Sequence, residues 1–372
     1  MPKRKKLRIL MPDGWPGSLS FFFARAFLRL EHEVYQFSPD GLLVPQSKDK
    51  LASHSFTLAH DAISLHGHKN FLATLLRKLN NYVGNLIMQY RLPRLVRNVR
   101  PDILFLVKNL NLTKTTLDQI REAWECLIFF FHPEDFLYPS ENSTPAFLQC
   151  IPLYDCIFTP TKVNVQEYLL RGAQRAEYLP YGYDPEWHFP VNIPPSECLT
   201  YCTDIAFVGK WTPQRADFLE ALAGHYKLGI WGNMWEHVDK KSPIRPFLKF
   251  RYAVGDEMRK VYSGARIALT FVMRPPQRQM HVMRTFEIPA CGALQLSERT
   301  DEQTAFFEEG KEIVCYGSKE EFLEKVKYLV KNHQARNQIA CAGSKRLVES
   351  RYTYEARMQK VISVYEDLKG CR

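Results

Sequence analysis

The sequence lacks the long apolar run that a membrane-spanning segment requires. None of its 372 residues lies in a stretch approaching the ~18 continuous apolar residues that cross a bilayer. The apolar run at residues 7–11 follows basic residues, but it is too short for the core of a signal peptide. We therefore expect a cytoplasmic protein whose contact with a membrane is at most peripheral, at the inner face.

Cysteine is present, but not in the spacing of a redox pair or a metal site. The nine cysteines are an odd number and none lies in a CxxC pair. Cys126, Cys156 and Cys315 fall in apolar segments, which favours reduced thiols in a cytosol. Cys198 and Cys202 form a CxxxC without histidines at zinc spacing, so we expect two unpaired thiols near a linker.

Acidic residues are absent from one long interval. Between Asp61 and Asp102 there is no Asp or Glu, while seven Lys or Arg fall within it. Apolar residues recur there at helical spacing and predict an amphipathic helix or helix pair. A core-packed helix with a solvated cationic face accounts for this pattern. A surface at residues 62–101 that docks on an anionic membrane or acceptor accounts for it too, and agrees with the net charge of +10.

The length of the chain predicts two domains, because one hydrophobic core usually serves about 100 to 200 residues. Apolar strand-like runs alternate with helical segments, which is typical of parallel α/β domains. Prolines crowd between residues 180 and 195 and indicate a linker. We expect an N-terminal Rossmann-like domain at 1–184, a linker at 185–203, a C-terminal Rossmann-like domain at 204–352 and a final helix at 353–372.

The predicted elements form one series on each side of the linker. In the first half, strands are predicted at 7–11, 33–37, 103–107, 127–131 and 156–159, with helices at 18–30, 114–122 and 163–171. In the second half, strands are predicted at 205–208, 228–231, 267–271 and 293–296, with a helix at 214–223. Helices from residue 319 onward close the chain, the last at 354–368.

The segment 284–312 carries the most informative pattern. A helical turn with Glu287 ends at Gly292 in a left-handed cap, and the apolar run 293–296 follows as a buried strand. Pro289 fits this helix only in its first turn. Arg284 and Glu287 are thereby placed at a helix N-terminus beside the carboxyl ends of parallel strands, where open α/β sheets bind ligands.

A second polar group follows a predicted strand in the segment FVGKWTPQR. The strand delivers Gly209 and Lys210 into a turn, and Arg215 lies at the start of the next helix. The free N–H groups of a helix start attract anions, so a pyrophosphate is the expected ligand. The alternative is that Lys210 and Arg215 are solvated surface cations.

Polar residues also follow the predicted strand at 127–131. His132 suits a general base toward a hydroxyl because imidazole titrates near working pH, and Asp135 can orient it or act as the base. A loop cap that only satisfies backbone donors is the alternative. The first loop, DGWPGS, contains Gly14 and Gly17, which allow close backbone approach to a ligand, although the GxGxxG fingerprint is absent.

Several segments, in this order, resemble the CgeB-like spore-maturation glycosyltransferases of the GT-B superfamily: DIAFVGKWTPQR, YSGARIALTF, MRTFEIPACGA, FFEEGKEIV and the terminal helices. The resemblance covers most of the chain and is strongest from Asp204 to Arg357. It implies the α/β GT-B fold, in which two Rossmann-like domains face a cleft and the last helix crosses back to the N-terminal domain.

The resemblance also implies a donor site in the C-terminal domain. In retaining GT-B relatives, the helix before an ACG-like turn bears the second glutamate of an E-x7-E signature, which grips the donor ribose hydroxyls. Glu287 matches that glutamate, whereas the first glutamate is replaced by Gln279. The predicted nucleotide-sugar and diphosphate site comprises Gly14, Gly209, Lys210, Arg215, Trp231, Gly232, Arg284 and Glu287. The resemblance also gives His132 a second role beside that of a base, because a comparably placed histidine hydrogen-bonds the donor sugar in many retaining relatives.

The predicted function is the transfer of a sugar from a nucleoside-diphosphate sugar, UDP before other carriers, with retention of configuration. The chain has no D-x-D motif, which holds the metal in the other large glycosyltransferase fold, so we expect neither metal nor cofactor. A surface glycan, a lipid-linked glycan, a protein and modified DNA stay open as acceptors. A GT-B sugar-nucleotide epimerase is one alternative. A non-catalytic glycan- or nucleotide-binding scaffold, which Gln279 favours, is the other.

Overall fold

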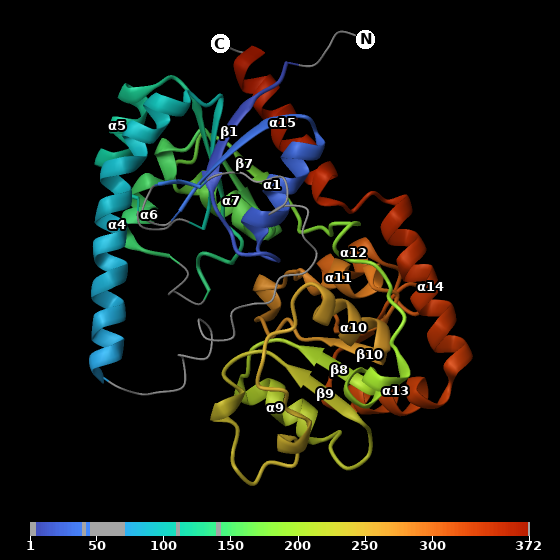
Figure 1. The fold of residues 1–372 in the computed structure, drawn as a ribbon. Coiled ribbons are helices and arrows are strands. Elements are labelled where there is room, and N and C mark those ends of the chain that lie inside the picture. The colour runs from blue at the N-terminus through green and yellow to red at the C-terminus, as the bar shows by residue number, and fades with distance from the viewer. Residues whose placement is uncertain (1–4, 39–41, 45–70, 109–111, 139–142, 371–372) are drawn as a thin grey trace. The chain divides into compact units, whose positions relative to one another are not determined.

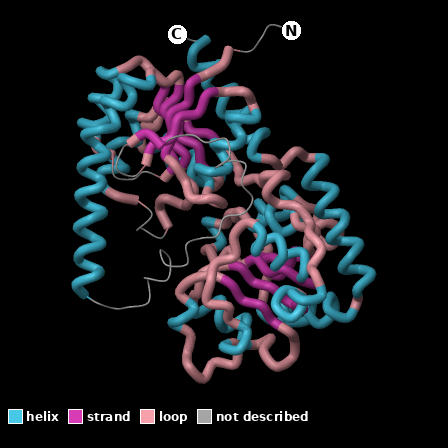
Figure 2. The backbone as a smooth tube through the Cα atoms, viewed as in Figure 1, coloured by secondary structure: helices cyan, strands magenta, loops and turns pink. Residues whose placement is uncertain are grey.

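The computed structural model describes residues 5–38, 42–44, 71–108, 112–138 and 143–370. Internal contacts divide the chain into two compact units, Met1–Pro180 together with Tyr354–Arg372, and Tyr181–Thr353. Each unit is a largely parallel sheet with helices packed on it (Figure 1, Figure 2). This confirms the predicted pair of Rossmann-like domains.

The N-terminal unit is built on a seven-stranded sheet in the order β3-β2-β1-β4-β5-β6-β7. Its central strands β4, β5 and β6 are apolar runs that are almost entirely buried, as in parallel sheets covered by helices on both faces. The short β3 is the antiparallel strand of this sheet, and the strand order reverses between β1 and β4. The strands are β1 Arg8–Pro12, β2 Glu33–Phe37, β3 Leu43–Val44, β4 Ile103–Val107, β5 Leu127–Phe131, β6 Cys156–Thr159 and β7 Ala176–Tyr178.

The last helix of the chain belongs to the N-terminal unit. The ring of Tyr354 stacks on that of Phe22 with centroids 5.0 Å apart, and Glu355 pairs with Arg29. This is the return that the resemblance implied. The helices of the unit are α1 Leu19–Arg29, α4 Phe71–Val99, α5 Lys114–Ala123, α6 Pro145–Cys150, α7 Lys162–Leu170 and α15 Tyr354–Gly370.

The C-terminal unit is built on a five-stranded parallel sheet in the order β12-β11-β10-β8-β9. The strand order reverses between β8 and β10, which pair directly. The strands are β8 Thr203–Val208, β9 Leu228–Trp231, β10 Ala265–Thr270, β11 Leu294–Glu298 and β12 Val314–Tyr316. The helices are α8 Cys198–Tyr201, α9 Pro213–Glu220, α10 Asp256–Gly264, α11 Arg284–Ala290, α12 Asp301–Phe306, α13 Lys319–Lys331 and α14 His333–Glu349.

Helix α13 shows why these segments form where they do. Its N-cap Ser318 accepts a hydrogen bond from the backbone N–H of Glu321. Phe322, Val326 and Leu329 lie on one face at a spacing of four and three residues, and all three are buried in the core of the unit. An apolar stripe and a cap therefore fix both the start of the helix and the face that it packs.

Two local predictions are wrong. Cys198 and Cys202 form a disulfide instead of staying unpaired, because the turn of α8 brings their Cα atoms to 4.7 Å. Pro289 is the sixth of the seven residues of α11 rather than part of its first turn. A helix this short tolerates it, because the ring removes one N–H donor near the end of the helix.

In the described part of the chain, no helix is long and apolar enough to cross a membrane.

Candidate functional site

The candidate site lies at the carboxyl ends of β8 and β10, where the strand order of the C-terminal unit reverses. In open α/β sheets this point opens a crevice that binds ligands. Val208 ends β8 and is followed by Gly209 and Lys210, while Thr270 ends β10. Helix α11, which begins at Arg284, leads into the neighbouring strand β11. The fold thus brings together segments that are far apart in the sequence.

Arg215 ties the two strand ends together. It lies in the first turn of α9, where its backbone N–H donates to Oγ1 of the N-cap Thr212 at 3.2 Å. Its Nη1 donates to the carbonyl of Lys210 at 3.0 Å, beyond β8, and its Nη2 to the carbonyl of Phe271 at 3.3 Å, beyond β10. The guanidinium is therefore held in place at the reversal of strand order.

Positive charge accumulates around this guanidinium. Burial, together with the positive charges of Arg284 and Arg274, lowers the pKa of Arg215 to about 10. The side chain of Arg215 therefore remains protonated at neutral pH. The nearby carboxylate of Glu298 accepts hydrogen bonds from the backbone N–H groups of Val272 and Met273, at 3.0 and 2.7 Å. Three cations held near one another destabilise the empty site and favour an anionic ligand.

Glu287 is the buried carboxylate of the site. Glu287 is 2% exposed, and its Oε2 lies 3.3 Å from Nη1 of Arg284. That Oε2 accepts no hydrogen bond from any described residue. Its Oε1 lies 3.7 Å from Nε2 of His188, a fully buried imidazole whose pKa is lowered by burial and which is therefore neutral at pH 7. A buried carboxylate with spare acceptor capacity suits a ligand with hydroxyl donors.

Gly209 and Gly232 are brought together by the pairing of β8 with β9. The N–H of Gly209 donates to the carbonyl of Trp231 at 2.9 Å. Gly232 has φ of +132°, and a Cβ placed on it would lie 2.0 Å from the carbonyl oxygen of Gly209. A side chain at position 232 would therefore push the two strand ends apart. Lys210, next to this contact, is exposed.

Trp231 is a core residue of this unit. It is fully buried, and its Nε1 donates to Oε1 of Glu257 at 3.1 Å. Arg251 donates to the same carboxylate oxygen at 2.7 Å. The indole is thus fixed by packing and by a satisfied hydrogen bond, and its place in the nucleotide-sugar site stays a prediction.

Gly14 lies in the N-terminal unit, just beyond β1. A Cβ on it would lie 2.2 Å from Oγ of Ser18, so the glycine lets the loop pack directly against the start of α1. The neighbouring Trp15 is 56% exposed. The loop is therefore tightly folded at the strand end where the N-terminal unit reverses its strand order, and a ligand contact at Gly14 stays a prediction.

His132 and Asp135 lie in the core of the N-terminal unit, not on its surface. Both are fully buried, and Nδ1 of His132 lies 2.6 Å from the hydroxyl of Tyr168. The ring of Phe147 lies 5.2 Å from the imidazole, centroid to centroid. Oδ1 of Asp135 accepts from the backbone N–H of Leu137 at 3.0 Å, as in the loop-cap alternative. The catalytic roles of His132 and Asp135 stay predictions, and the complete burial of both side chains argues against them.

Sequence reasoning missed His188 and Tyr262 as neighbours of Glu287. His188 falls in the proline-rich segment that predicts a linker, and no signal in that segment identifies it. Tyr262 is fully buried on α10, and burial raises the pKa of its hydroxyl far above the usual value, with Arg284 and Glu287 among the charges acting on it. Only the fold places these residues beside α11.

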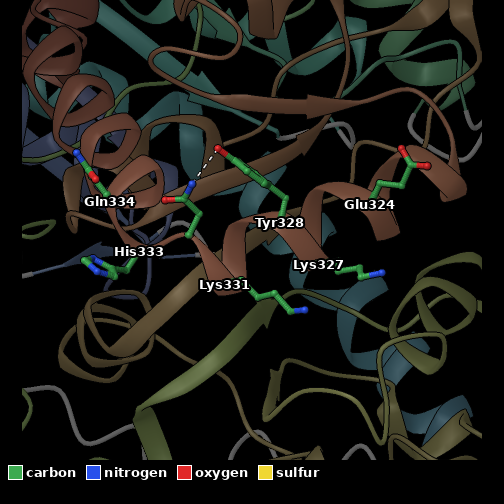
Figure 3. A pocket seen from close by; sticks show the side chains of 7 residues that line it. Glu324, Lys327, Tyr328, Lys331, His333 and Gln334 are labelled. Carbon is green, nitrogen blue, oxygen red and sulfur yellow. Dashed lines mark hydrogen bonds between the residues drawn. The ribbon is translucent and has the colours of Figure 1, made fainter.

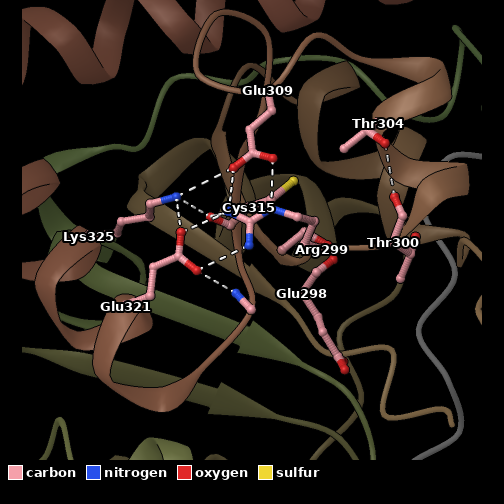
Figure 4. Close-up of polar contacts among 10 residues, drawn as sticks. Glu298, Arg299, Thr300, Thr304, Glu309, Cys315, Glu321 and Lys325 are labelled. Atoms are coloured by element: carbon pink, nitrogen blue, oxygen red, sulfur yellow. Dashed lines mark hydrogen bonds and ion pairs between the residues drawn. The ribbon is translucent and has the colours of Figure 1, made fainter. Parts of the chain in front are cut away.

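A network of four charged side chains braces the loop after β11 (Figure 4). Arg299 pairs with Glu309 at 2.6 Å and with Glu321 at 2.7 Å, and Lys325 pairs with the same two carboxylates. The network begins directly after Glu298, whose carboxylate holds the end of β10. The network therefore fixes the segment that follows the carboxyl end of β11.

The surface hollow of Figure 3 lies elsewhere in the unit. Its lining comes from the end of α13 and the start of α14, with Tyr328 and Asn332 joined by a hydrogen bond of 3.0 Å. A helix that follows a parallel strand runs back toward the amino ends of the sheet. The end of α13 is therefore on the side of the sheet away from Arg215 and Glu287.

Comparison with known proteins agrees with this geometry. Residues 214–363 match the family described as glycosyl transferase-like. No curated protein sequence matches the chain. Sucrose-phosphate synthase from Thermosynechococcus elongatus is similar in structure, with a TM-score of 0.67 and 12% identity over 99% of this chain and 100% of that one.

Two further structures share the fold. An α-glucosyltransferase in complex with UDP and a 13-mer DNA containing an HMU base has a TM-score of 0.62 at 12% identity, over 97% of this chain and 100% of that one. A putative UDP-N-acetylglucosamine 2-epimerase from Listeria monocytogenes has a TM-score of 0.56 at 11% identity, over 99% of this chain and 98% of that one. The finer resemblance to CgeB-like proteins stays a prediction. The chain has the GT-B fold, and its residues 214–363 are similar to the glycosyl transferase-like family.

Proposed function

We propose that this protein is a glycosyltransferase that uses a UDP-sugar as donor. The observation that carries the proposal is the gathering of Arg215, Arg274 and Arg284 around the carboxyl ends of β8 and β10. Such an excess of positive charge suits a diphosphate. The match of residues 214–363 to glycosyl transferase-like proteins supports the same assignment, and the complex of the α-glucosyltransferase supports UDP as the carrier.

Two parts of the donor have complementary partners in this site. The guanidinium groups of Arg215 and Arg284, together with Lys210, hold the diphosphate. The spare oxygen of Glu287 accepts from the ribose hydroxyls. The negative charge of Glu287 would repel the diphosphate. Arg284, whose Nη1 lies 3.3 Å from Oε2 of Glu287, offsets that charge.

The arginine cluster contributes to the rate as well as to binding. When the bond between the sugar C1 and the diphosphate oxygen breaks, negative charge grows on the departing UDP. Cations held in place beforehand stabilise this charge more in the transition state than in the bound donor. We therefore propose that the reaction needs no metal ion. We also propose that it retains the anomeric configuration, on the match of Glu287 to the retaining relatives.

A sugar-nucleotide epimerase is the second candidate, because an enzyme of that kind shares the fold over almost the whole chain. An incubation with UDP-glucose and UDP-N-acetylglucosamine, without acceptor, separates the candidates. Slow release of UDP with an unchanged sugar supports a transferase. A donor whose sugar has changed its configuration supports an epimerase, and binding without either product supports a non-catalytic scaffold.

A further inference from the structure

Helix α4 of the N-terminal unit has two faces of different character. The structure describes its side chains from Val83 onward, and the face formed by Met88, Leu92, Leu95, Val96 and Val99 is buried in the core. At 100° per residue, a second stripe lies within an arc of about 80° on the opposite side of the helix. Its members are Val83, Leu86, Tyr90, Arg94 and Arg97, all of them exposed.

This exposed stripe, Val83 to Arg97, is apolar in one half and basic in the other. Val83, Leu86 and Tyr90 are 42%, 49% and 66% exposed, which is unusual for three large apolar side chains along one helix. Arg94 lies over the ring of Tyr90 with its Cζ 3.6 Å from the centroid, so the two halves are continuous. In the described part of the chain, neither Arg94 nor Arg97 forms an ion pair.

The surroundings of the stripe in the sequence are free of negative charge. No Asp or Glu lies between Asp61 and Asp102, so nothing on α4 itself opposes an anionic partner. The helix is also the longest one described, and in Figure 1 its N-terminal part reaches past the sheet of its own unit. The stripe therefore lies on a long helix that carries no negative charge.

We propose that the stripe from Val83 to Arg97 docks this protein on an anionic lipid surface. Valine, leucine and tyrosine side chains on one helix face enter the boundary between headgroups and acyl chains, with tyrosine suited to its polar edge. Arg94 and Arg97 lie where they contact lipid phosphates. Nucleic acid fits less well, because exposed valine and leucine have no partner on a phosphate backbone. The inference does not depend on the proposed donor chemistry.

Vesicle co-sedimentation tests the proposal on the full chain. Vesicles of phosphatidylglycerol mixed with phosphatidylcholine should bind the wild type, and vesicles of phosphatidylcholine alone should bind it far less. Arg94→Gln with Arg97→Gln should lower the partition coefficient about thirtyfold, since each lost cation weakens attraction to an anionic surface. Leu86→Ser with Tyr90→Ser should lower it to a similar degree while leaving the charge unchanged.

Lys327→Gln with Lys331→Gln is the matched control, because it removes two exposed cations from α13 without touching α4. The control should bind anionic vesicles within about twofold of the wild type, since its stripe is intact. Melting temperature checks that each variant is folded. Equal losses in the control and in the arginine variant overturn the proposal, as does wild-type protein that ignores anionic vesicles. Binding of duplex DNA instead of vesicles, or self-association that both stripe variants abolish, also overturns it.

Discussion

The two units follow the same plan, but they treat the polar residues after their strands in opposite ways. In the C-terminal unit, Arg215 and Arg284 are partly exposed and share a point where strand order reverses. In the N-terminal unit, His132 and Asp135 follow β5 and are fully buried. Position after a parallel strand therefore does not define a site by itself. We propose the donor site in the C-terminal unit because Arg215, Arg274 and Arg284 are partly exposed and lie near one another where the strand order reverses.

The largest effect should come from removing two cations of the C-terminal site. Arg215→Ala combined with Arg284→Ala should weaken UDP binding by about 3–6 kcal/mol, since each charge-assisted hydrogen bond is worth about 1.5–3 kcal/mol. Calorimetric titration should show this as a loss of about two to four orders of magnitude in affinity. Arg266→Ala is the control, because Arg266 lies at the amino end of β10 and pairs with Asp204. If Arg266→Ala weakens UDP binding as much as the double variant does, the carboxyl ends of the strands are not the place where the diphosphate binds.

The buried imidazole of the N-terminal unit should act on stability rather than on donor binding. His132→Ala removes the contact with Tyr168 and leaves a small cavity, so the free energy of unfolding should fall by about 3 kcal/mol. Urea denaturation measures this, and UDP affinity should stay unchanged. His225→Ala, at an exposed position, should leave the unfolding free energy within about 0.5 kcal/mol of the wild type. A His132 variant of full stability but lost turnover would restore the catalytic role predicted from the sequence.

How far the sequence leads can be seen by comparing β5 with α11. The apolar run at 127–131 and the capped turn ending at Gly292 fix these elements, because burial on both faces and a left-handed cap each leave a local pattern. The burial of the His132 side chain leaves no local pattern in the sequence, because it depends on contacts with Tyr168 and Phe147 from later segments. His188 beside Glu287 is likewise a product of tertiary packing. Local patterns therefore predict the frame and the basic cluster, but not the neighbours of the buried carboxylate.

A smaller loss of affinity is expected at the carboxylate of the site. Glu287→Ala should weaken UDP binding by about 1.5–3 kcal/mol, because it removes the acceptor proposed for the ribose hydroxyls. The loss should be specific to ligands with a ribose, so the affinity for inorganic pyrophosphate should not fall. Glu308→Ala, at an exposed position in the same unit, serves as control. Equal affinity of the Glu287 variant and the wild type for UDP would remove Glu287 from the donor site.

The smallest effect concerns the network that Arg299 and Lys325 form with Glu309 and Glu321. Hydrogen bonds from Arg299 lower the pKa values of Glu309 and Glu321 below the unfolded value of about 4.3. Their stabilisation is therefore present above that pH and is lost as the pH falls through the lowered pKa values. The wild type should lose folding stability as the pH falls from about 5 to about 3. In the variant Glu309→Gln with Glu321→Gln, this loss should be smaller by less than about 1 kcal/mol, because the side chains are partly exposed. Thermal melts across that range provide the measurement, and unchanged acid sensitivity would show that the network contributes nothing.

The central claim is that a diphosphate, rather than the nucleoside, dominates binding at the carboxyl ends of β8 and β10. Calorimetric titration of the wild type with UDP and with uridine, each with and without EDTA, tests it most directly. We predict that UDP binds at least about a hundredfold more tightly than uridine, because two or more charge-assisted contacts are added, and that EDTA changes neither value. Equal affinities for UDP and uridine, or UDP binding that disappears with EDTA, would contradict the account.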